Sequence, residues 1–140
     1  MYLYREMKPD DYAEAYALWS RTEGVGLGHS DSEEAIAKYL ARNPGHSFVC
    51  EHGGRIVGTV LCGHDGRRGY LYHVAVSEEH HKRGIVRTLL TKALDRLRDA
   101  GIRKCHLMVF SGHYAGQEFW EHIGWQRRED VLLYSKSIPG

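Results

Sequence analysis

The hydrophobic and polar positions of the chain follow different periods in different stretches, and each period predicts an element. Residues 1–7 alternate loosely, which is typical of a strand. A helix is expected from Pro9 onward, because proline and the two acids after it suit a first helical turn. The apolar stripe of this helix consists of Tyr12, Ala15, Tyr16, Leu18 and Trp19. A second helix is expected over residues 32–42, capped by Ser30 or Asp31 and ended by Asn43-Pro44-Gly45.

The middle of the chain changes to the period of strands. Residues 47–52 and 55–64 read as two strands around Gly53-Gly54, a pair that suits a two-residue hairpin turn. Asp65-Gly66 begins a second turn, and residues 70–76 form a third strand. We therefore expect an antiparallel meander of three strands.

A helical period follows the meander. Residues 84–100 have apolar side chains at helical spacing, and Gly101 stands where a helix end favours glycine. Residues 104–110 are expected to form a strand, which makes 70–110 a right-handed β-α-β unit. A shorter helix is predicted over 114–123, and the tail 125–137 is predicted to hold a last strand or hairpin. The order of elements predicts a mixed α/β domain rather than a doubly wound one.

Composition and charge narrow the function classes. A chain of 140 residues fits one domain, expected over 1–140. A net charge of +1 argues against a dedicated nucleic-acid binder. No apolar run approaches the ~20 residues of a membrane span, and the first residues lack a signal-peptide pattern. Three widely spaced cysteines suggest reduced, buried thiols, so a cytoplasmic location is expected. The ten histidines show no HExxH-type spacing, so no metal site is expected.

Positive charge gathers at the start of the best predicted helix. Residues 80–87 include two histidines and three basic side chains, and no acid. A helix N-terminus disfavours cations and favours anions, so this arrangement is in conflict unless something negative binds there. Gly84 would let a ligand approach the backbone closely. Two interpretations stay open on these residues alone: a solvated basic surface, or a site for an anion such as a pyrophosphate.

Two stretches carry a family resemblance. The first reads Leu71-Tyr72-His73-Val74-Ala75-Val76, followed by His81-Lys82-Arg83-Gly84-Ile85-Val86 and Arg87-Thr88-Leu89-Leu90. The second reads Phe119-Trp120-Glu121-His122-Ile123-Gly124-Trp125. They resemble motifs A and B of the GNAT N-acetyltransferase superfamily, and the order of elements resembles it over nearly the whole chain. The resemblance implies a GNAT fold: a central, mostly antiparallel, splayed sheet of six to seven strands with about four helices.

The resemblance also implies a co-substrate, acetyl-CoA, and residues that bind it. The pantetheine arm would pair with main-chain groups of Val74 and Val76, where the sheet splays apart. The pyrophosphate would lie on the amides of residues 82–87. The chain departs from the family pattern at His81, which replaces Gln or Arg, and at Val86, which replaces a small residue. The full expected set is Val74, Ala75, Val76, His81, Lys82, Arg83, Gly84, Ile85, Val86, Arg87, Thr88, His113 and Trp120.

The catalytic residues are less evident than the cofactor segment. The family often has Glu or His just before the Val-Ala-Val stretch, and the matching positions are Tyr70 and Tyr72. By the period of a strand these share one face, and His73 points to the other, where a buried, satisfied histidine is expected. We expect Tyr72 to order a proton-relaying water. Trp120 occupies the place of the family's thiolate-protonating tyrosine, where it either shapes the thioester pocket or simply packs in the core.

The resemblance implies direct transfer of an acetyl group from acetyl-CoA to a primary amine in a ternary complex. The acceptor is a small molecule or a protein, and no nucleic acid or membrane is expected as a partner. A non-catalytic acyl-CoA-binding sensor on the same fold is the alternative, favoured by Trp120 and by the missing base. Edge strands could pair between copies, so a homodimer is a further expectation.

Overall fold

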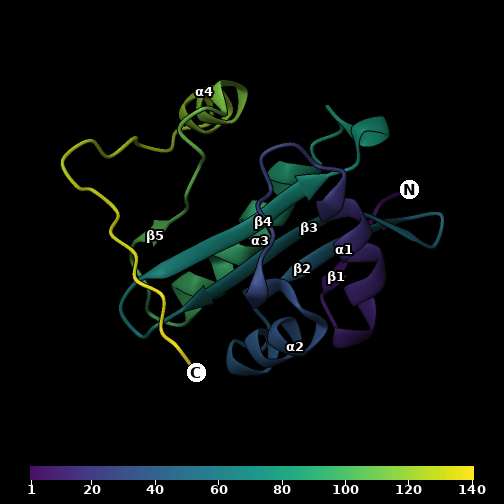
Figure 1. The fold of residues 1–140 in the computed structure, drawn as a ribbon. Helices are drawn as coiled ribbons and strands as arrows, with labels where there is room; N and C mark the ends of the chain where they lie inside the picture. Colours follow the sequence, from purple (N-terminus) through teal and green to yellow (C-terminus); the bar gives the residue numbers. More distant parts are fainter. The chain divides into compact units, whose positions relative to one another are not determined.

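The computed structural model describes all 140 residues, which divide into two compact units, Met1–Met108 and Val109–Gly140. The first unit contains a five-stranded sheet in the order β1-β2-β3-β4-β5 (Figure 1). The second contains one helix and an irregular tail. The elements are β1 (Leu3–Glu6), η1 (Pro9–Asp11), α1 (Tyr12–Ser20), η2 (His29–Asp31), α2 (Glu33–Arg42), β2 (Phe48–His52), β3 (Arg55–His64), β4 (Gly69–Val76), η3 (Glu78–His80), α3 (Ile85–Asp99), β5 (Cys105–His106) and α4 (Tyr114–His122).

The sheet confirms the predicted topology in its main features. β2, β3 and β4 form the antiparallel meander, and β1 pairs antiparallel with β2 at its edge. β4 and β5 are parallel and are joined through α3, as the β-α-β prediction requires. No helix of the structure is long and apolar enough to span a membrane.

The prediction of six to seven strands is wrong, because the sheet has five. β5 pairs over only two residues, Cys105 and His106, instead of 104–110, and the tail 125–137 forms no strand. The charged residues 127–130 of the tail satisfy one another locally. Arg128, for example, donates to both oxygens of Asp130 at 2.9 Å. The backbone hydrogen bonds of the structure end at Trp125, so the tail beyond it has no ladder that would make it a strand.

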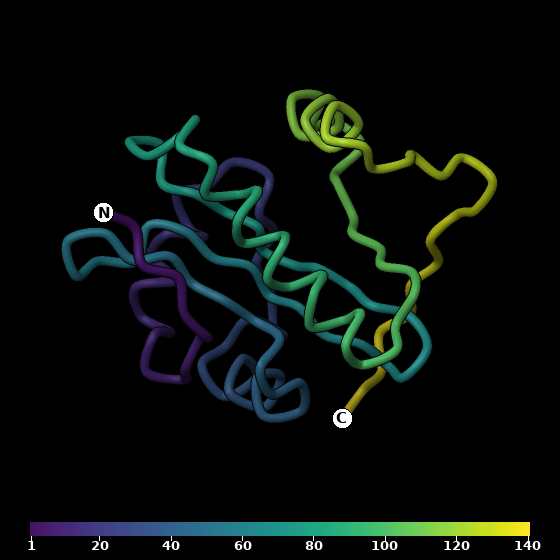
Figure 2. The backbone as a smooth tube through the Cα atoms, turned by 180° about the vertical axis from the view of Figure 1, so that it is seen from behind, coloured from purple at the N-terminus to yellow at the C-terminus, as the bar shows by residue number.

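The helices of the first unit form two layers on the sheet. α1 and α2 cover one face and α3 covers the other, as Figure 1 and the reverse view in Figure 2 show. In α1 the buried residues are Ala15, Leu18 and Trp19. Tyr16 was predicted to belong to the apolar stripe, but it is 36% exposed, so this part of the prediction is wrong. The α2 cap is Ser32, whose Oγ accepts from the Ala35 N–H, and not Ser30 or Asp31.

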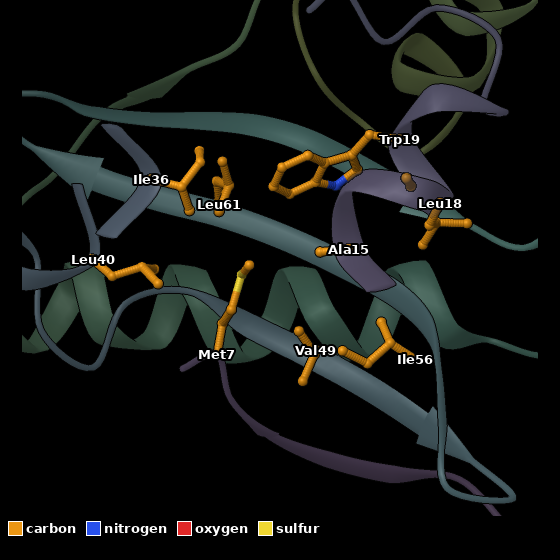
Figure 3. Packing of buried hydrophobic residues seen from close by; sticks show 10 residues of the cluster. Met7, Ala15, Leu18, Trp19, Ile36, Leu40, Val49, Ile56 and Leu61 are labelled. Carbon is orange, nitrogen blue, oxygen red and sulfur yellow. The ribbon is translucent and has the colours of Figure 1, made fainter. Parts of the chain in front are cut away.

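The core between the sheet and the α1–α2 layer is centred on Trp19. Figure 3 shows its indole beside Leu61 of β3, with Ala15 and Leu18 from the same helix. Trp19 is fully buried, and Met7, Ile36 and Leu40 close the cluster from the adjoining segments. Burying an aromatic ring of this size stabilises the fold by roughly 3 kcal/mol or more. The cluster therefore fixes α1 against the sheet.

Two glycines let α3 lie close to the other face. A Cβ at Gly58 of β3 would come within 2.9 Å of Ile85 Cγ2 and 3.3 Å of Leu89 Cδ1. A Cβ at Gly69 of β4 would come within 2.6 Å of Leu97 Cδ1. The helix is therefore held to the sheet at both its first and last turns. The close contacts at the two glycines determine the position of the first turn of α3 relative to the sheet.

The second unit is organised by the end of α4. Gly124 has φ 101°, and the N–H groups of Gly124 and Trp125 donate to the carbonyls of Glu121 and Trp120, the second bond measuring 2.9 Å. This is a Schellman arrangement, in which an apolar contact usually joins the residue after the glycine to the last turn. Here the rings of Trp120 and Trp125 make that contact, 5.2 Å apart and edge to face. The aromatic–glycine–aromatic spacing thus has a local structural reason.

Candidate functional site

The outer edge of β4 is the first feature of the candidate site. β5 pairs only with Gly69 and Tyr70, so Leu71 to Val76 have no strand on that side. The Ser77 N–H donates to the Val57 carbonyl at 2.8 Å, and by antiparallel alternation Val76 therefore directs its own N–H and carbonyl away from β3. The separation of β4 and β5 begins at Leu71, earlier than the expected position after Val76. An extended ligand could pair along this edge as a strand does.

The loop from Lys82 to the start of α3 is the second feature. Lys82 has φ 63° and Gly84 has φ 77°, both in the left-handed region. The first α-helical bond runs from the Thr88 N–H to the Gly84 carbonyl at 3.1 Å, so the N–H groups of residues 85–87 precede the ladder. No side chain caps the helix, and its first turn contains no acid. These free donors and the helix dipole make a site that favours an anion.

The basic side chains of this loop are free to reach a ligand. Lys82, Arg83 and Arg87 are exposed, and no ion pair of the structure involves them. Ile85 points the other way, buried against the sheet, and Val86 is half-buried. Nothing lies within 4 Å of where a Gly84 Cβ would be, so the space beside its backbone is open. The predicted cofactor residues of this segment therefore lie together.

His81 lies at the junction of the two features. Its Nε2 is 3.1 Å from the Val76 carbonyl, and only the tautomer protonated at Nε2 donates there. The ring is thus hydrogen-bonded to the open edge of β4. Its predicted hydrogen bond to a pyrophosphate stays a prediction, which requires the ring to exchange one acceptor for another or to use its other nitrogen.

Tyr70 and Tyr72 lie on β4, and their surroundings differ. The Tyr70 ring is 5.6 Å from the His106 ring of β5. The Tyr72 ring meets the edge of Tyr39 of α2 at 6.2 Å and remains 38% exposed. Burial, and to a lesser degree the neighbouring Tyr70, raises the pKa of Tyr72 above its usual value. Tyr72 is therefore a neutral hydroxyl at pH 7, able to donate and accept hydrogen bonds but not to serve as a base.

A β-bulge changes the predicted face of His73. The register between β3 and β4 shifts between Thr59, opposite Ala75, and Leu61, opposite Tyr72. His73 stands in this bulge with φ 48°. Its ring lies 4.6 Å from the Trp19 ring, in the α1–α2 layer that Tyr72 also contacts. The prediction that His73 points to the opposite face is wrong, because the extra residue breaks the period of two.

His73 is of intermediate burial rather than fully buried, and one of its ring nitrogens is partnered by a carboxyl group. Its Nε2 lies 2.6 Å from Asp31 Oδ1, and the two side chains are 11% and 10% exposed. The sequence reasoning missed Asp31 as a site residue and considered it only as a helix cap. Its position before a predicted helix suggested that role, and no local signal marks a partner 42 residues away.

Trp120 and His113 belong to the second unit. Trp120 contacts Phe119 and Trp125 there, and His113 is the residue before α4, with its ring over Gly116. His113 makes no side-chain cap hydrogen bond to the helix. The contacts of Trp120 favour a structural role for its ring, and the predicted roles of both residues at the cofactor stay predictions.

The sequence is similar to known acetyltransferases over nearly its whole length. A sequence model described as "Acetyltransferase (GNAT) family" matches residues 12–125. An acetyltransferase of Sodalis glossinidius is 30% identical over 134 residues, which cover 96% of this chain and 94% of that protein. An acetyltransferase of Photorhabdus laumondii is also 30% identical, with the same coverage of both chains.

The fold is similar to that of solved acetyltransferases. AAC(6')-Iy, solved in complex with the bisubstrate analogue CoA-S-monomethyl-acetylneamine, superposes with a TM-score of 0.75 at 17% identity, covering 99% of each chain. At these identities the likeness concerns the fold alone.

Proposed function

The chain belongs to the GNAT acetyltransferase family, and we propose that it transfers an acetyl group from acetyl-CoA directly to a primary amine of a small molecule or protein. The observation that carries the proposal is the open edge of β4, which leads into an acid-free helix N-terminus. One feature suits an extended amide-containing arm and the other suits a pyrophosphate. Acetyl-CoA contains both groups in that order.

The residues present fit this co-substrate. Val74 and the Val76 N–H offer main-chain groups to the pantetheine amides, since the Val76 carbonyl is bonded to His81 Nε2 at 3.1 Å. The amides of residues 82–87 receive the pyrophosphate, with Lys82 and Arg83 beside them. Each charge-assisted hydrogen bond of this kind contributes about 1.5–3 kcal/mol. The open space at Gly84 admits the phosphates close to the backbone. Bound there, acetyl-CoA supplies an acetyl group activated as a thioester.

The acceptor amine presents the larger proton problem. A lysine-like amine has a pKa near ~10.4, so its neutral form at pH 7 costs roughly 4.6 kcal/mol. The leaving group is a thiol with a pKa near ~8.5, so its thiolate form at pH 7 costs only about 2 kcal/mol. Tyr72 is exposed and neutral, so it can order a water next to the amine but cannot hold the proton. Tyr70 lies on the same strand, with its ring beside His106.

Protonation of the sulfur does not need a strong acid by this comparison. The indole N–H of Trp120 donates hydrogen bonds and does not release its proton. Water can therefore supply the proton to the sulfur.

Calorimetry and thiol release test the proposal together. Titration with acetyl-CoA should give saturable binding that 3',5'-ADP alone does not reproduce, because the pantetheine arm pairs with β4. A panel of primary amines should then give CoA thiol release. Gly84→Glu should abolish both, because it places a carboxylate among the phosphate donors.

Gly66→Glu is the matched control for this experiment. Gly66 also has a positive φ, 91°, with nothing within 4 Å of its Cβ position, but it lies in the β3–β4 turn. The control should bind and turn over like the unmodified protein. Binding of acetyl-CoA without thiol release from any amine would favour the acyl-CoA sensor instead. Absence of binding would refute the proposal.

A further inference from the structure

His73 and Asp31 form a largely buried hydrogen-bonded pair on the sheet face opposite α3, and the proposed function does not use it. Their contact of 2.6 Å joins β4 to η2, the short helix that ends at Asp31 before α2. Asp31 is only 7% exposed. A largely buried pair that includes a carboxylate contributes little net stability, because the cost of desolvating the carboxylate offsets the attraction. The pair therefore calls for an explanation other than folding.

The hydrogen bonds of the pair fix which ring nitrogen carries the proton. A carboxylate only accepts hydrogen bonds, and Asp31 also accepts from the Gly28 N–H through Oδ2 at 2.9 Å. His73 must therefore donate from Nε2, which leaves a lone pair on Nδ1 in the neutral ring. Nδ1 has no protein partner, and the buried unpartnered side-chain atoms are Tyr39 Oη and His46 Nε2. Nδ1 thus reaches water.

Further hydrogen bonds hold both residues in place. The Trp19 Nε1–H donates to Thr59 Oγ1 at 2.8 Å, and that hydroxyl donates to the His73 carbonyl at 2.8 Å. The Tyr12 hydroxyl donates to the Asp31 carbonyl at 2.6 Å. α1 and β3 therefore position the pair from two sides. A base with fixed geometry is what proton transfer at a reacting centre requires.

The bulge brings the pair to the end of the proposed thioester site. His73 precedes Val74, the first residue whose main chain we assign to the pantetheine arm. The backbone of His73 is in a left-handed conformation that a non-glycine residue rarely adopts, and such strain is typical of functional positions. Without the bulge the ring would lie on the α3 face. The bulge therefore places an oriented imidazole next to the acetyl-binding edge.

We propose that His73, oriented by Asp31, is the base that takes the proton from the acceptor amine, directly or through the water beside Tyr72. This inference rests on the proposed acetyl transfer. The ammonium gives one proton to Nδ1 of His73, and the freed nitrogen lone pair forms the N–C bond to the acetyl carbon. The C–S bond breaks with its electron pair going to sulfur, which receives the second proton leaving the nitrogen. His73 then releases its proton to water.

The titratable groups that face His73 are few. Asp31 of η2 contacts the ring directly, and Tyr12 of α1 acts on it only through the Asp31 carbonyl. Trp19 and Thr59, from α1 and β3, do not titrate. Tyr72, next along β4, is a neutral hydroxyl. In this proposal Asp31 is a positioning residue, and His73 is the group that takes the proton.

The first experiment replaces the base. His73→Asn removes the imidazole, while asparagine tolerates the positive φ of the bulge. With the amine that the panel shows to be most active, kcat should fall by roughly 10²- to 10⁴-fold with an unchanged Kd for acetyl-CoA. The loss should shrink as pH rises and the amine deprotonates in solution. His46→Asn, at a histidine bonded to the Pro44 carbonyl beyond the far end of α2, should leave kcat unchanged.

The second experiment replaces the positioning residue. Asp31→Asn can donate its amide N–H to Nε2, which moves the ring proton to Nδ1 and removes the lone pair. Long-range ¹H–¹⁵N NMR of the histidine rings should show the Nε2–H tautomer in the unmodified protein and the Nδ1–H tautomer in this variant. The kcat should fall as in His73→Asn, and the double variant should be no slower than either single one.

The outcomes separate this inference from the proposed function. If the unmodified protein turns over and a folded His73→Asn variant turns over equally well, the assignment of His73 as the base is refuted. The proposed acetyl transfer then still stands. An Nδ1–H tautomer in the unmodified protein would overturn the assignment of His73 as well. Absence of turnover by the unmodified protein would instead refute the proposed function, from which the inference proceeds.

Discussion

Gly58 of β3 is the position where a single methyl group should most directly disturb the proposed acetyl-CoA site. A Cβ there would approach Ile85 Cγ2 to 2.9 Å, Leu89 Cδ1 to 3.3 Å and Cys50 Cβ to 3.4 Å. Cγ2 is attached to the β-carbon of a β-branched, fully buried side chain, so it cannot move without moving the helix backbone. We predict that Gly58→Ala pushes the first turn of α3 away from the sheet.

The expected cost follows from overpacking. Extra methyl groups in a well-packed core cost typically 1–3 kcal/mol, and about 2 kcal/mol fits a contact this short with little freedom to relax. Unfolding entropy of about 2.1 cal/mol/K per residue converts this into a fall of about 7 °C in Tm for a chain of this length. Because Ile85 opens α3, the Kd for acetyl-CoA should rise several-fold as the free N–H groups shift.

Thermal melts by circular dichroism and calorimetric titration measure these two effects. Gly112→Ala is the control, because nothing lies within 4 Å of its Cβ position and its φ is not left-handed, so its Tm should stay unchanged. The Ile85→Ala background removes the clashing Cγ2, and there Gly58→Ala should cost much less. An equal cost in both backgrounds, or an unchanged Tm for the single variant, would refute the packing argument.

Three further predictions concern charge, thiols and the second unit. Burial alone would raise the pKa of Asp11, but hydrogen bonds from Arg5 and the Lys8 N–H outweigh it and lower the pKa. The stability that this carboxylate contributes is therefore present above about pH 4 and is lost as the pH falls further. In Asp11→Asn, the free energy of unfolding measured in urea should fall less steeply with decreasing pH. Burial raises the pKa of Cys62 to about 12 and of Cys105 to about 11, so a disulfide reagent at pH 8 should label the native protein far more slowly than the urea-unfolded one; equal rates would contradict the burial. Gly124→Ala forces a side chain to φ 101° and should destabilise the end of α4 by about 1–2 kcal/mol, seen as lost ellipticity at 222 nm, whereas Gly140→Ala should show no loss.

The strand–loop–helix structure around Gly84 could be predicted from sequence because its determinants are local. The alternation of residues 70–76, the glycine at 84 and the helical period after it lie within one stretch, and each acts on its own neighbours. The structure accordingly has β4, the left-handed Gly84 and α3 where they were expected. The meander could be predicted for the same reason, since its strands are joined by short turns. The tail could not, because a strand needs a partner edge that its own sequence does not specify.

The sequence by itself determined the family, the order of elements and the strand–loop–helix segment that we propose binds acetyl-CoA, since these depend on residue type and short-range period. Only the tertiary structure decided which side chains of β4 face the α1–α2 layer. One extra residue in the β4 ladder rotates His73 to the α1–α2 layer, and the packing of Trp19 and η2 brings Asp31 to it across 42 residues. A bulge is a property of two strands paired together, and a contact of that span follows from the packing of whole layers. No local stretch of the sequence determines either the bulge or the contact.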